Sequence, residues 1–158
     1  MMKKLILLAV TTMLAGGAAA QSGGFSGGAT NGPMQCTTKQ CTVTITPSCK
    51  ADNSGCGGTI DYDPIRLQRG NKDVKLTWVL PTGFVFCRKQ NDGVFLTNGP
   101  SNQFEEDPAN GQGGCKRDFK MKGLNSVPAP NAPYIYEIRF RRESDNKPYL
   151  IDPSMVNE

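Results

Sequence analysis

Length, composition and charge already limit what this chain can be. It has 158 residues, with 18 Lys and Arg, 14 Asp and Glu, and a formal net charge of +4. After position 20, Leu, Ile, Val and Phe supply only 26 of 138 residues, which is close to the limit at which a chain still buries a stable core. These values allow one domain, and they exclude a large multidomain enzyme and a nucleic-acid binder driven by bulk charge.

The N-terminal segment has the three parts of a bacterial export signal. Lys3 and Lys4 form a basic region, residues 5–14 form a short apolar stretch, and residues 18–20 are all alanine. The apolar stretch is too short for a membrane-spanning helix, which needs about 20 apolar residues. Residues 1–20 are therefore predicted to be a signal peptide. The mature protein is predicted to be periplasmic or secreted, and not membrane-spanning.

A glycine-rich stretch, QSGGFSGGATNGP, follows the predicted cleavage site. Five of its thirteen residues are glycine, and such a segment loses much backbone entropy when it becomes ordered. Residues 21–35 are therefore predicted to be a flexible Gly/Ser-rich arm. The remaining residues, 36–158, are predicted to form a single β domain.

From Cys36 onward the sequence shows the two-residue alternation of β-strands. Along residues 41–46, apolar residues alternate with threonines, which is typical of a half-buried strand. Outside the signal peptide, no stretch of helical length shows apolar residues at helical spacing. The predicted strands are residues 41–46, 65–67, 74–80, 84–87, 94–96, 134–140 and 149–151.

Turn-forming residues indicate how these strands are connected. The Arg-Gly-Asn sequence at 69–71 predicts a hairpin between strands 65–67 and 74–80. The Asn-Asp-Gly sequence at 91–93 predicts a turn with positive φ, and residues 144–146 predict a final hairpin near the C-terminus.

The arrangement as a whole predicts an all-β fold. Residues 84–87 are apolar on both faces, as expected of a central strand, while residues 98–114 are rich in Asn, Gly, Pro and acid and predict a long loop. Many short strands with frequent turns are typical of a β-sandwich. We expect a disulfide-stabilised β-sandwich, with immunoglobulin-like topology as one form and a small β-barrel as the alternative.

The cysteines carry the most specific chemistry in the chain. An exported chain meets an oxidising compartment, where an even number of cysteines favours disulfide bonds. No Cys-x-x-Cys motif is present, and the cysteines between 36 and 56 lack the spacing of a zinc site, which is the alternative. The pairing stays open, although a Cys87–Cys115 bridge would tie the long loop to the core. The predicted disulfide cysteines are Cys36, Cys41, Cys49, Cys56, Cys87 and Cys115.

The absence of histidine excludes several kinds of catalysis. Ser-His-Asp and Cys-His mechanisms and histidine-ligated metals all require it. No phosphate-binding loop or dinucleotide fingerprint is present, so neither a cofactor nor a metal is predicted. The acids at 61–63 and 105–107 leave carboxylate chemistry open as an alternative, although they lack EF-hand spacing and solvated turn acids are the simpler interpretation.

Two basic stretches, at 116–122 and 139–142, remain as candidates for binding. If the sheet brings them together, they form a patch for an anionic envelope polymer, a lipid head group or an acidic protein. Alternating arginines on a strand are also typical of a solvated face that resists aggregation. The candidate binding residues are Lys116, Arg117, Arg139, Arg141 and Arg142.

The C-terminal residues carry a resemblance to other proteins. Alternating residues Tyr134, Tyr136, Ile138 and Phe140 are followed by an Asp-Pro-x-x-x-Asn tail at 152–157. This ending resembles that of small, uncharacterised exported β-proteins of Gram-negative bacteria. The resemblance implies a β fold and export, and it implies no activity.

Together, these patterns predict an exported, non-enzymatic binding or accessory module of the bacterial cell envelope. The alternative is a carboxylate-dependent hydrolase or inhibitor that acts on envelope polymer. A pair of carboxylates in a cleft would favour the hydrolase, whereas a flat basic or aromatic patch would favour binding.

Overall fold

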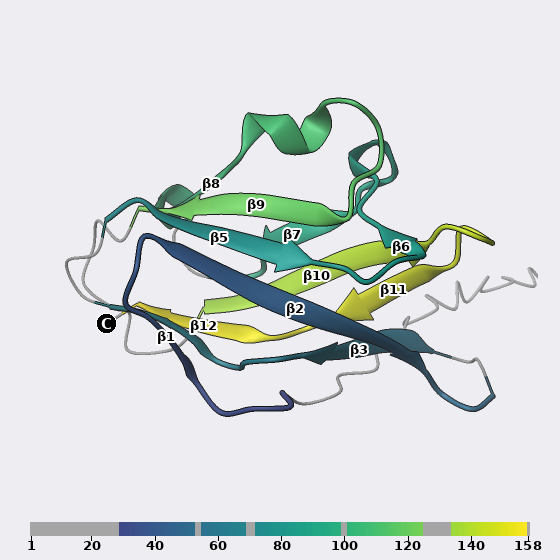
Figure 1. The fold of residues 1–158 in the computed structure, drawn as a ribbon, viewed down its shortest axis with the longest axis horizontal. Helices are drawn as coiled ribbons and strands as arrows, with labels where there is room; N and C mark the ends of the chain where they lie inside the picture. Colours follow the sequence, from purple (N-terminus) through teal and green to yellow (C-terminus); the bar gives the residue numbers. More distant parts are fainter. Residues whose placement is uncertain (1–28, 53–54, 69–71, 99–100, 125–133, 158) are drawn as a thin grey trace, which may run out of the picture.

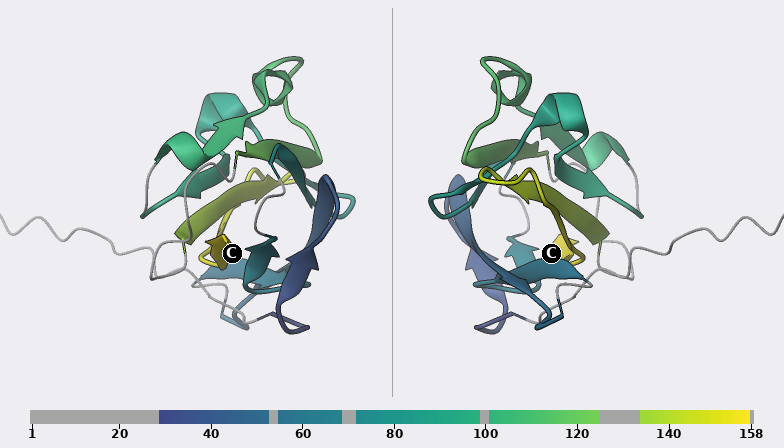
Figure 2. Two further views of the ribbon diagram at one scale, coloured as in Figure 1. Left: turned by 90° about the vertical axis from the view of Figure 1, so that its left-hand side faces the viewer. Right: turned by 90° about the vertical axis from the view of Figure 1, so that its right-hand side faces the viewer.

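Two β-sheets packed face to face make up the protein. The computed structural model describes residues 29–52, 55–68, 72–98, 101–124 and 134–157. Within them, one sheet has five strands and the other has seven (Figures 1 and 2). The fold is therefore all-β, and the predicted β-sandwich is confirmed. Short 3₁₀ helices gather on one side of the two sheets: η1 (Arg88–Gln90), η2 (Ser101–Gln103) and η3 (Pro108–Gly111).

The five-stranded sheet contains the longest strand, β2, in which threonines alternate with apolar residues. Val43 and Ile45 of β2 are buried, while Thr42, Thr44 and Thr46 are exposed. β2 pairs with β5 in parallel, and the other neighbouring strands of this sheet are antiparallel. The strand order is β3 (Cys56–Ile60), β2 (Gln40–Cys49), β5 (Val74–Val79), β9 (Asp118–Gly123) and β8 (Phe104–Glu106).

The seven-stranded sheet is organised around β10. This strand pairs antiparallel with β6, β7, β11 and β12, while β4 pairs in parallel with both β1 and β12. Tyr136, Ile138 and Phe140 of β10 are buried, and Glu137 and Arg139 alternate with them. The strands are β1 (Met34–Cys36), β4 (Ile65–Leu67), β6 (Phe84–Val85), β7 (Gly93–Leu96), β10 (Tyr134–Arg142), β11 (Pro148–Ile151) and β12 (Ser154–Asn157).

Aromatic rings join the two sheets through the core. Trp78 of β5 meets Tyr136 of β10 edge to face, with ring centroids 5.8 Å apart. Phe104 of β8 meets Tyr134 of β10 in the same way at 5.5 Å. All four residues are buried, and such pairs add to the free energy gained by burying the rings.

All six cysteines form disulfide bonds, as the sequence predicts for an oxidising compartment. The predicted bridge between residues 87 and 115 is present, and it ties the segment that carries β8 and η3 to the core. A second bridge connects the facing ends of β2 and β3. The pairs are Cys36–Cys41, Cys49–Cys56 and Cys87–Cys115.

The predicted hairpin between residues 65–67 and 74–80 is wrong. β4 lies in the seven-stranded sheet, and β5 lies in the five-stranded sheet. The chain therefore crosses between sheets after Leu67, and the predicted turn at 69–71 lies outside the described residues. The final hairpin is confirmed, because β10 and β11 pair antiparallel from Ile138 to Arg141.

Two other predictions are corrected by the pairing of short strands. Residues 85–87 are buried and Phe84 is half-buried, but the segment is not central, because β6 spans only Phe84–Val85 and pairs with β10 alone among the described strands. The Phe86 backbone instead bridges to that of Lys116, and the Phe86 ring packs against Phe119 and Phe140. The predicted loop at 98–114 contains β8, which completes the five-stranded sheet, together with η2 and η3.

The alternatives for the topology are settled in part. The two sheets stay separate layers, so the described strands form no closed barrel. The immunoglobulin-like topology is not confirmed. The pairs β2·β5, β1·β4 and β4·β12 are parallel, whereas immunoglobulin domains are built from antiparallel sheets.

Part of the predicted arm, residues 21–35, contacts the domain. These contacts lie in its described portion, from residue 29 onward. The Thr30 N–H donates to the Ile60 carbonyl at 3.1 Å, and β1 begins at Met34. The predicted signal peptide, 1–20, lies outside the described residues. Among the described helices, none is long and apolar enough to cross a membrane.

Candidate functional site

The five basic residues predicted from the sequence each have a partner within the chain. Lys116 and Arg117 lie just before β9. The Lys116 ammonium group donates to the Ala109 carbonyl, and the Arg117 guanidinium donates to the Leu80 carbonyl at 3.2 Å. These contacts tie the start of β9 to η3 and to the end of β5.

Arg141 is held in a nearly buried ion pair. Its Nε and Nη2 atoms lie 2.6 and 2.8 Å from the two carboxylate oxygens of Asp92. The two side chains are only 12% and 4% exposed, and Asp92 also accepts the Cys87 N–H at 3.0 Å. The neighbouring Arg142 instead pairs at the surface with Asp145, and this contact lowers the pKa of the Asp145 carboxyl to about 2.

Arg139 belongs to a charged and aromatic cluster that bridges the sheets. Its guanidinium carbon lies 5.0 Å from the ring centre of Phe95, and its Nε donates to Glu137 at 2.8 Å. Arg88 lies 5.4 Å from the same ring and pairs with Glu106 of β8 at 2.8 Å. The cluster therefore connects β8 to β7 and β10. Within it, the Arg139 guanidinium contacts residues of the protein itself.

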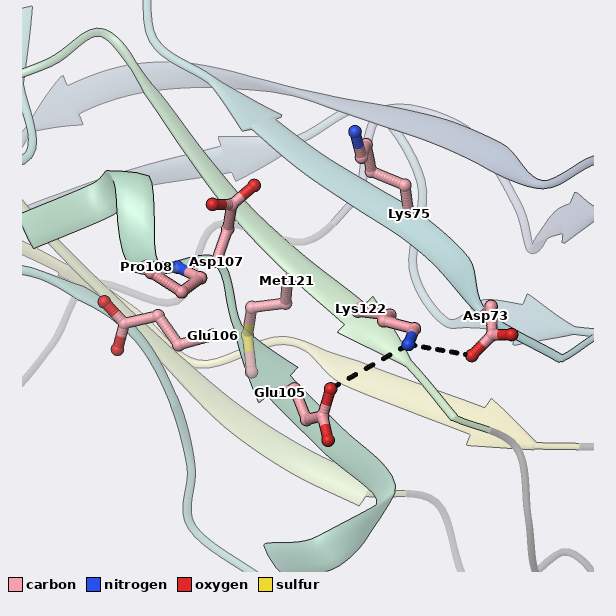
Figure 3. Close-up of a pocket in the computed structure, with 8 residues that line it drawn as sticks. All are labelled: Asp73, Lys75, Glu105, Glu106, Asp107, Pro108, Met121 and Lys122. Atoms are coloured by element: carbon pink, nitrogen blue, oxygen red, sulfur yellow. Dashed lines mark ion pairs between the residues drawn. The ribbon is translucent and has the colours of Figure 1, made fainter.

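A pocket on the solvent side of the five-stranded sheet is the stronger candidate site. It lies where β5, β8 and β9 run side by side and encloses about 370 Å³ (Figure 3). Lys122 of β9 is directly opposite both Lys75 of β5 and Glu105 of β8, so these three side chains share one face. We call it the β8 pocket, and its lining residues are Asp73, Lys75, Glu105, Glu106, Asp107, Pro108, Met121 and Lys122.

Some of the charged side chains that line the β8 pocket form ion pairs, and others do not. The Lys122 Nζ atom lies 3.0 Å from an Asp73 oxygen and 3.9 Å from a Glu105 oxygen, and its hydrogen bond to Asp73 raises the pKa of Lys122. No ion pair within the described ranges involves Lys75, whose ammonium group lies across from Asp107 in Figure 3. Lys75 is therefore the cation of this pocket that remains open to a ligand.

The remaining two acids of the pocket are anchored by the surrounding fold. The Glu106 carboxylate pairs with the Arg88 guanidinium through two N···O contacts of 2.8 Å. Asp107 accepts the Ala109 N–H at 2.9 Å and so caps η3, which begins with Pro108. The Asp107 carboxylate is therefore held at the wall of the pocket by its own backbone contacts.

This donor set is suited to ion pairing rather than to metal binding. Within the part of the chain that the structure describes, no group of three His, Cys, Asp or Glu residues could hold a metal ion. The pocket instead combines separated positive and negative charges on the exposed face of the sheet. Fixed charges of this kind orient small charged ligands.

A separate pair of carboxylates lies on the seven-stranded sheet. Asp152 follows β11, and partial burial, together with the nearby charge of Glu137, raises the pKa of its carboxyl. Glu137 is itself paired with Arg139, whose positive charge acts on the Asp152 carboxyl in the opposite direction. Neither residue lines the β8 pocket.

Sequence reasoning identified only part of this site. It noted the acids 105–107 as an alternative and residue 122 within a basic stretch, but it missed Asp73, Lys75 and Met121. The alternation of Lys75 with buried neighbours was a signal for its exposure, whereas its position beside β9 depends on strand register. No protein-family model matches the chain, and no curated protein or solved structure matches it.

Proposed function

We propose that this protein is an exported, non-enzymatic binding module of the bacterial cell envelope, periplasmic or secreted, and that its ligand occupies the β8 pocket. Export is supported by the signal-like N-terminus and by three disulfides, which are typical of oxidising compartments. Binding is supported by a concave site whose walls are built from paired strands.

The separation of charge in the β8 pocket carries this proposal. Lys75 contributes an ammonium group on one side, and Asp107 contributes a carboxylate on the other. Charges held apart by the fold favour a ligand with complementary charges. The sequence predicted that the five basic residues bind the anionic group of the ligand. We assign that contact to Lys75 instead.

Co-sedimentation with insoluble envelope polymer tests the proposal. We expect the wild type to sediment and Lys75→Glu to stay in the supernatant, because the reversed charge repels the anionic group of the ligand. Lys89→Glu is the matched control, since Lys89 is exposed on η1 outside the pocket. Binding should also weaken with salt, because the Debye length is about 10 Å at 0.1 M.

Two outcomes would contradict this function. Absence of the wild type from the pellet would exclude binding to the polymer. Equal sedimentation of the wild type, Lys75→Glu and Lys89→Glu would show that the polymer contacts another surface.

Asp152 and Glu137 favour a second candidate function, a carboxylate-dependent hydrolase of envelope polymer. Asp152 would act as the general acid, because its raised pKa keeps a proton available at higher pH than an ordinary aspartate. This candidate requires soluble fragments to be released by the wild type and by Lys75→Glu but not by Asp152→Asn. Absence of fragments with the wild type would remove it.

A further inference from the structure

The tetrapeptide Thr-Asn-Gly-Pro occurs twice in the chain, at 30–33 and at 97–100, and a third Asn-Gly pair lies at 110–111. Asparagine is one of the chemically labile residues of proteins. Its side-chain amide is most reactive before glycine, because a residue without a Cβ atom leaves its backbone nitrogen open to approach the asparagine carbonyl. Since the two tetrapeptides are identical, the contacts made by the fold determine which of the two asparagines reacts.

Asn110 is protected by the backbone of β9. It is buried in η3, its Nδ2 atom donates to the Lys120 carbonyl at 2.7 Å, and its Oδ1 atom accepts the Lys120 N–H at 3.0 Å. The side chain would have to break both hydrogen bonds before its carbonyl could turn toward Gly111. The fold therefore keeps this amide away from the following nitrogen.

Asn98 is exposed, but its side-chain carbonyl is engaged. The Oδ1 atom accepts the Ile135 N–H, and the neighbouring Thr97 N–H donates to the Ile135 carbonyl at 2.9 Å. These two contacts attach residues 97–98 to the start of β10. The hydrogen bond from Ile135 must break before the Asn98 carbonyl can meet the nitrogen of the next residue.

Asn31 lies in the same tetrapeptide but has a different environment. Asn31, Gly32 and Pro33 are all exposed, and the Asn31 backbone N–H donates to the Asp61 carbonyl at 2.9 Å. Among the described residues, no hydrogen bond involves the Asn31 side chain or the Gly32 N–H. A Cβ atom at position 32 would have no heavy atom within 4 Å beyond its chain neighbours. Both reacting groups are therefore accessible and can approach each other without breaking a hydrogen bond of their own.

We propose that Asn31 is a site of spontaneous deamidation, with water as the only co-reactant. The Gly32 nitrogen attacks the Asn31 Cγ atom and forms a new C–N bond, while the side-chain amide nitrogen leaves as ammonia together with the Gly32 proton. Water then opens the cyclic imide at one of its two carbonyls and yields aspartate or isoaspartate. The folded protein thereby gains a carboxylate at position 31 as it ages, and isoaspartate also lengthens the main chain there.

Peptide mapping by mass spectrometry tests this proposal in the folded, disulfide-bonded protein, incubated in mildly alkaline buffer. Water enriched in heavy oxygen marks the conversions that occur during the incubation, because its oxygen enters the product. Asn31 should convert about two- to tenfold faster than Asn98, the factor that one hydrogen bond contributes. Asn110 should stay unchanged over the same period.

Two controls separate the effect of the fold from the chemistry of the sequence. In urea with reduced disulfides, Asn31 and Asn98 should convert at similar rates, because the tetrapeptide around them is the same. Gly32→Ala should slow the conversion of Asn31 in the folded protein and leave Asn98 as it is. The site accepts alanine, since Gly32 has no positive φ and its Cβ position is open.

Three results would overturn the proposal. The first is that Asn98 converts as fast as Asn31 in the folded protein, and the second is that Asn31 stays intact over a period in which the unfolded chain reacts. The third is an unchanged rate at Asn31 in Gly32→Ala, because the Gly32 nitrogen would then not be the attacking group. These rates do not depend on binding to envelope polymer, so they leave the proposed function to its own test.

Discussion

At the scale of single residues, the partner of a side chain decides whether it is available to a ligand. Arg141 and Arg142 are neighbours on β10, yet Arg141 is 12% exposed against Asp92 and Arg142 is 39% exposed against Asp145. Removing one member of a buried pair leaves an uncompensated charge in the protein, whereas an exposed pair contributes little. The two arginines should therefore respond very differently to substitution.

Arg141→Met is expected to lower the free energy of unfolding by about 3–5 kcal/mol, because it leaves the Asp92 carboxylate buried without its cation. Urea denaturation followed by circular dichroism measures the change. Arg142→Met is the control, and its transition should coincide with that of the wild type. Equal transitions for both variants would mean that the Arg141–Asp92 pair does not stabilise the fold.

At the scale of strands, β2 and β3 approach closely at Gly58. This residue is paired with Pro47, and a Cβ atom at position 58 would lie 2.4 Å from the Thr46 carbonyl oxygen and 3.1 Å from the Pro47 Cα. Both neighbouring atoms belong to the backbone of β2, so a side chain at position 58 would have to push the strands apart. The short distance therefore requires glycine at this position.

Gly58→Ala should destabilise the protein by about 1–3 kcal/mol, the usual cost of overpacking. Gly111→Ala in η3 is the matched control, because no heavy atom of the described residues lies within 4 Å of the corresponding Cβ position. Thermal and urea unfolding of both variants provide the comparison. A Gly58→Ala protein as stable as Gly111→Ala would contradict the close approach of β2 and β3.

At the scale of the whole molecule, disulfides supplement a core that the composition makes thin. The Cys87–Cys115 bridge spans 28 residues, whereas Cys49–Cys56 spans 7. A cross-link restricts the unfolded chain more when it closes a longer loop. The longer bridge also holds β8 and η3, and therefore one side of the β8 pocket, to the rest of the domain.

Replacing Cys87 and Cys115 by alanine should cost about 3.5 kcal/mol, against about 2.4 kcal/mol for Cys49 and Cys56, on the loop-entropy relation. Each pair joins a buried cysteine to a more exposed one, which makes the comparison matched. Denaturant unfolding of the two double variants measures the difference. A larger loss for the Cys49 and Cys56 variant would contradict loop closure as the main effect.

The sequence by itself determined where seven of the described strands form, although not β1, β3, β8, β9 or β12, and that the cysteines pair with one another. Alternation is a local property, so the threonines of β2 and the aromatic residues of β10 identify their own buried faces without reference to any partner. The final hairpin was also predictable, because its turn and both strands are adjacent in the chain.

Only the tertiary structure decided which strands pair and which charges remain open to a ligand. Both depend on contacts between distant residues: Arg141 finds Asp92 49 positions away, and β5 pairs with β2 and β9 rather than with β4. Alternation identifies the faces of a strand but not its neighbours, since several pairings bury the same apolar face. The β8 pocket exists because strand register places Lys75, Lys122 and Glu105 in one row, and no local pattern encodes that row.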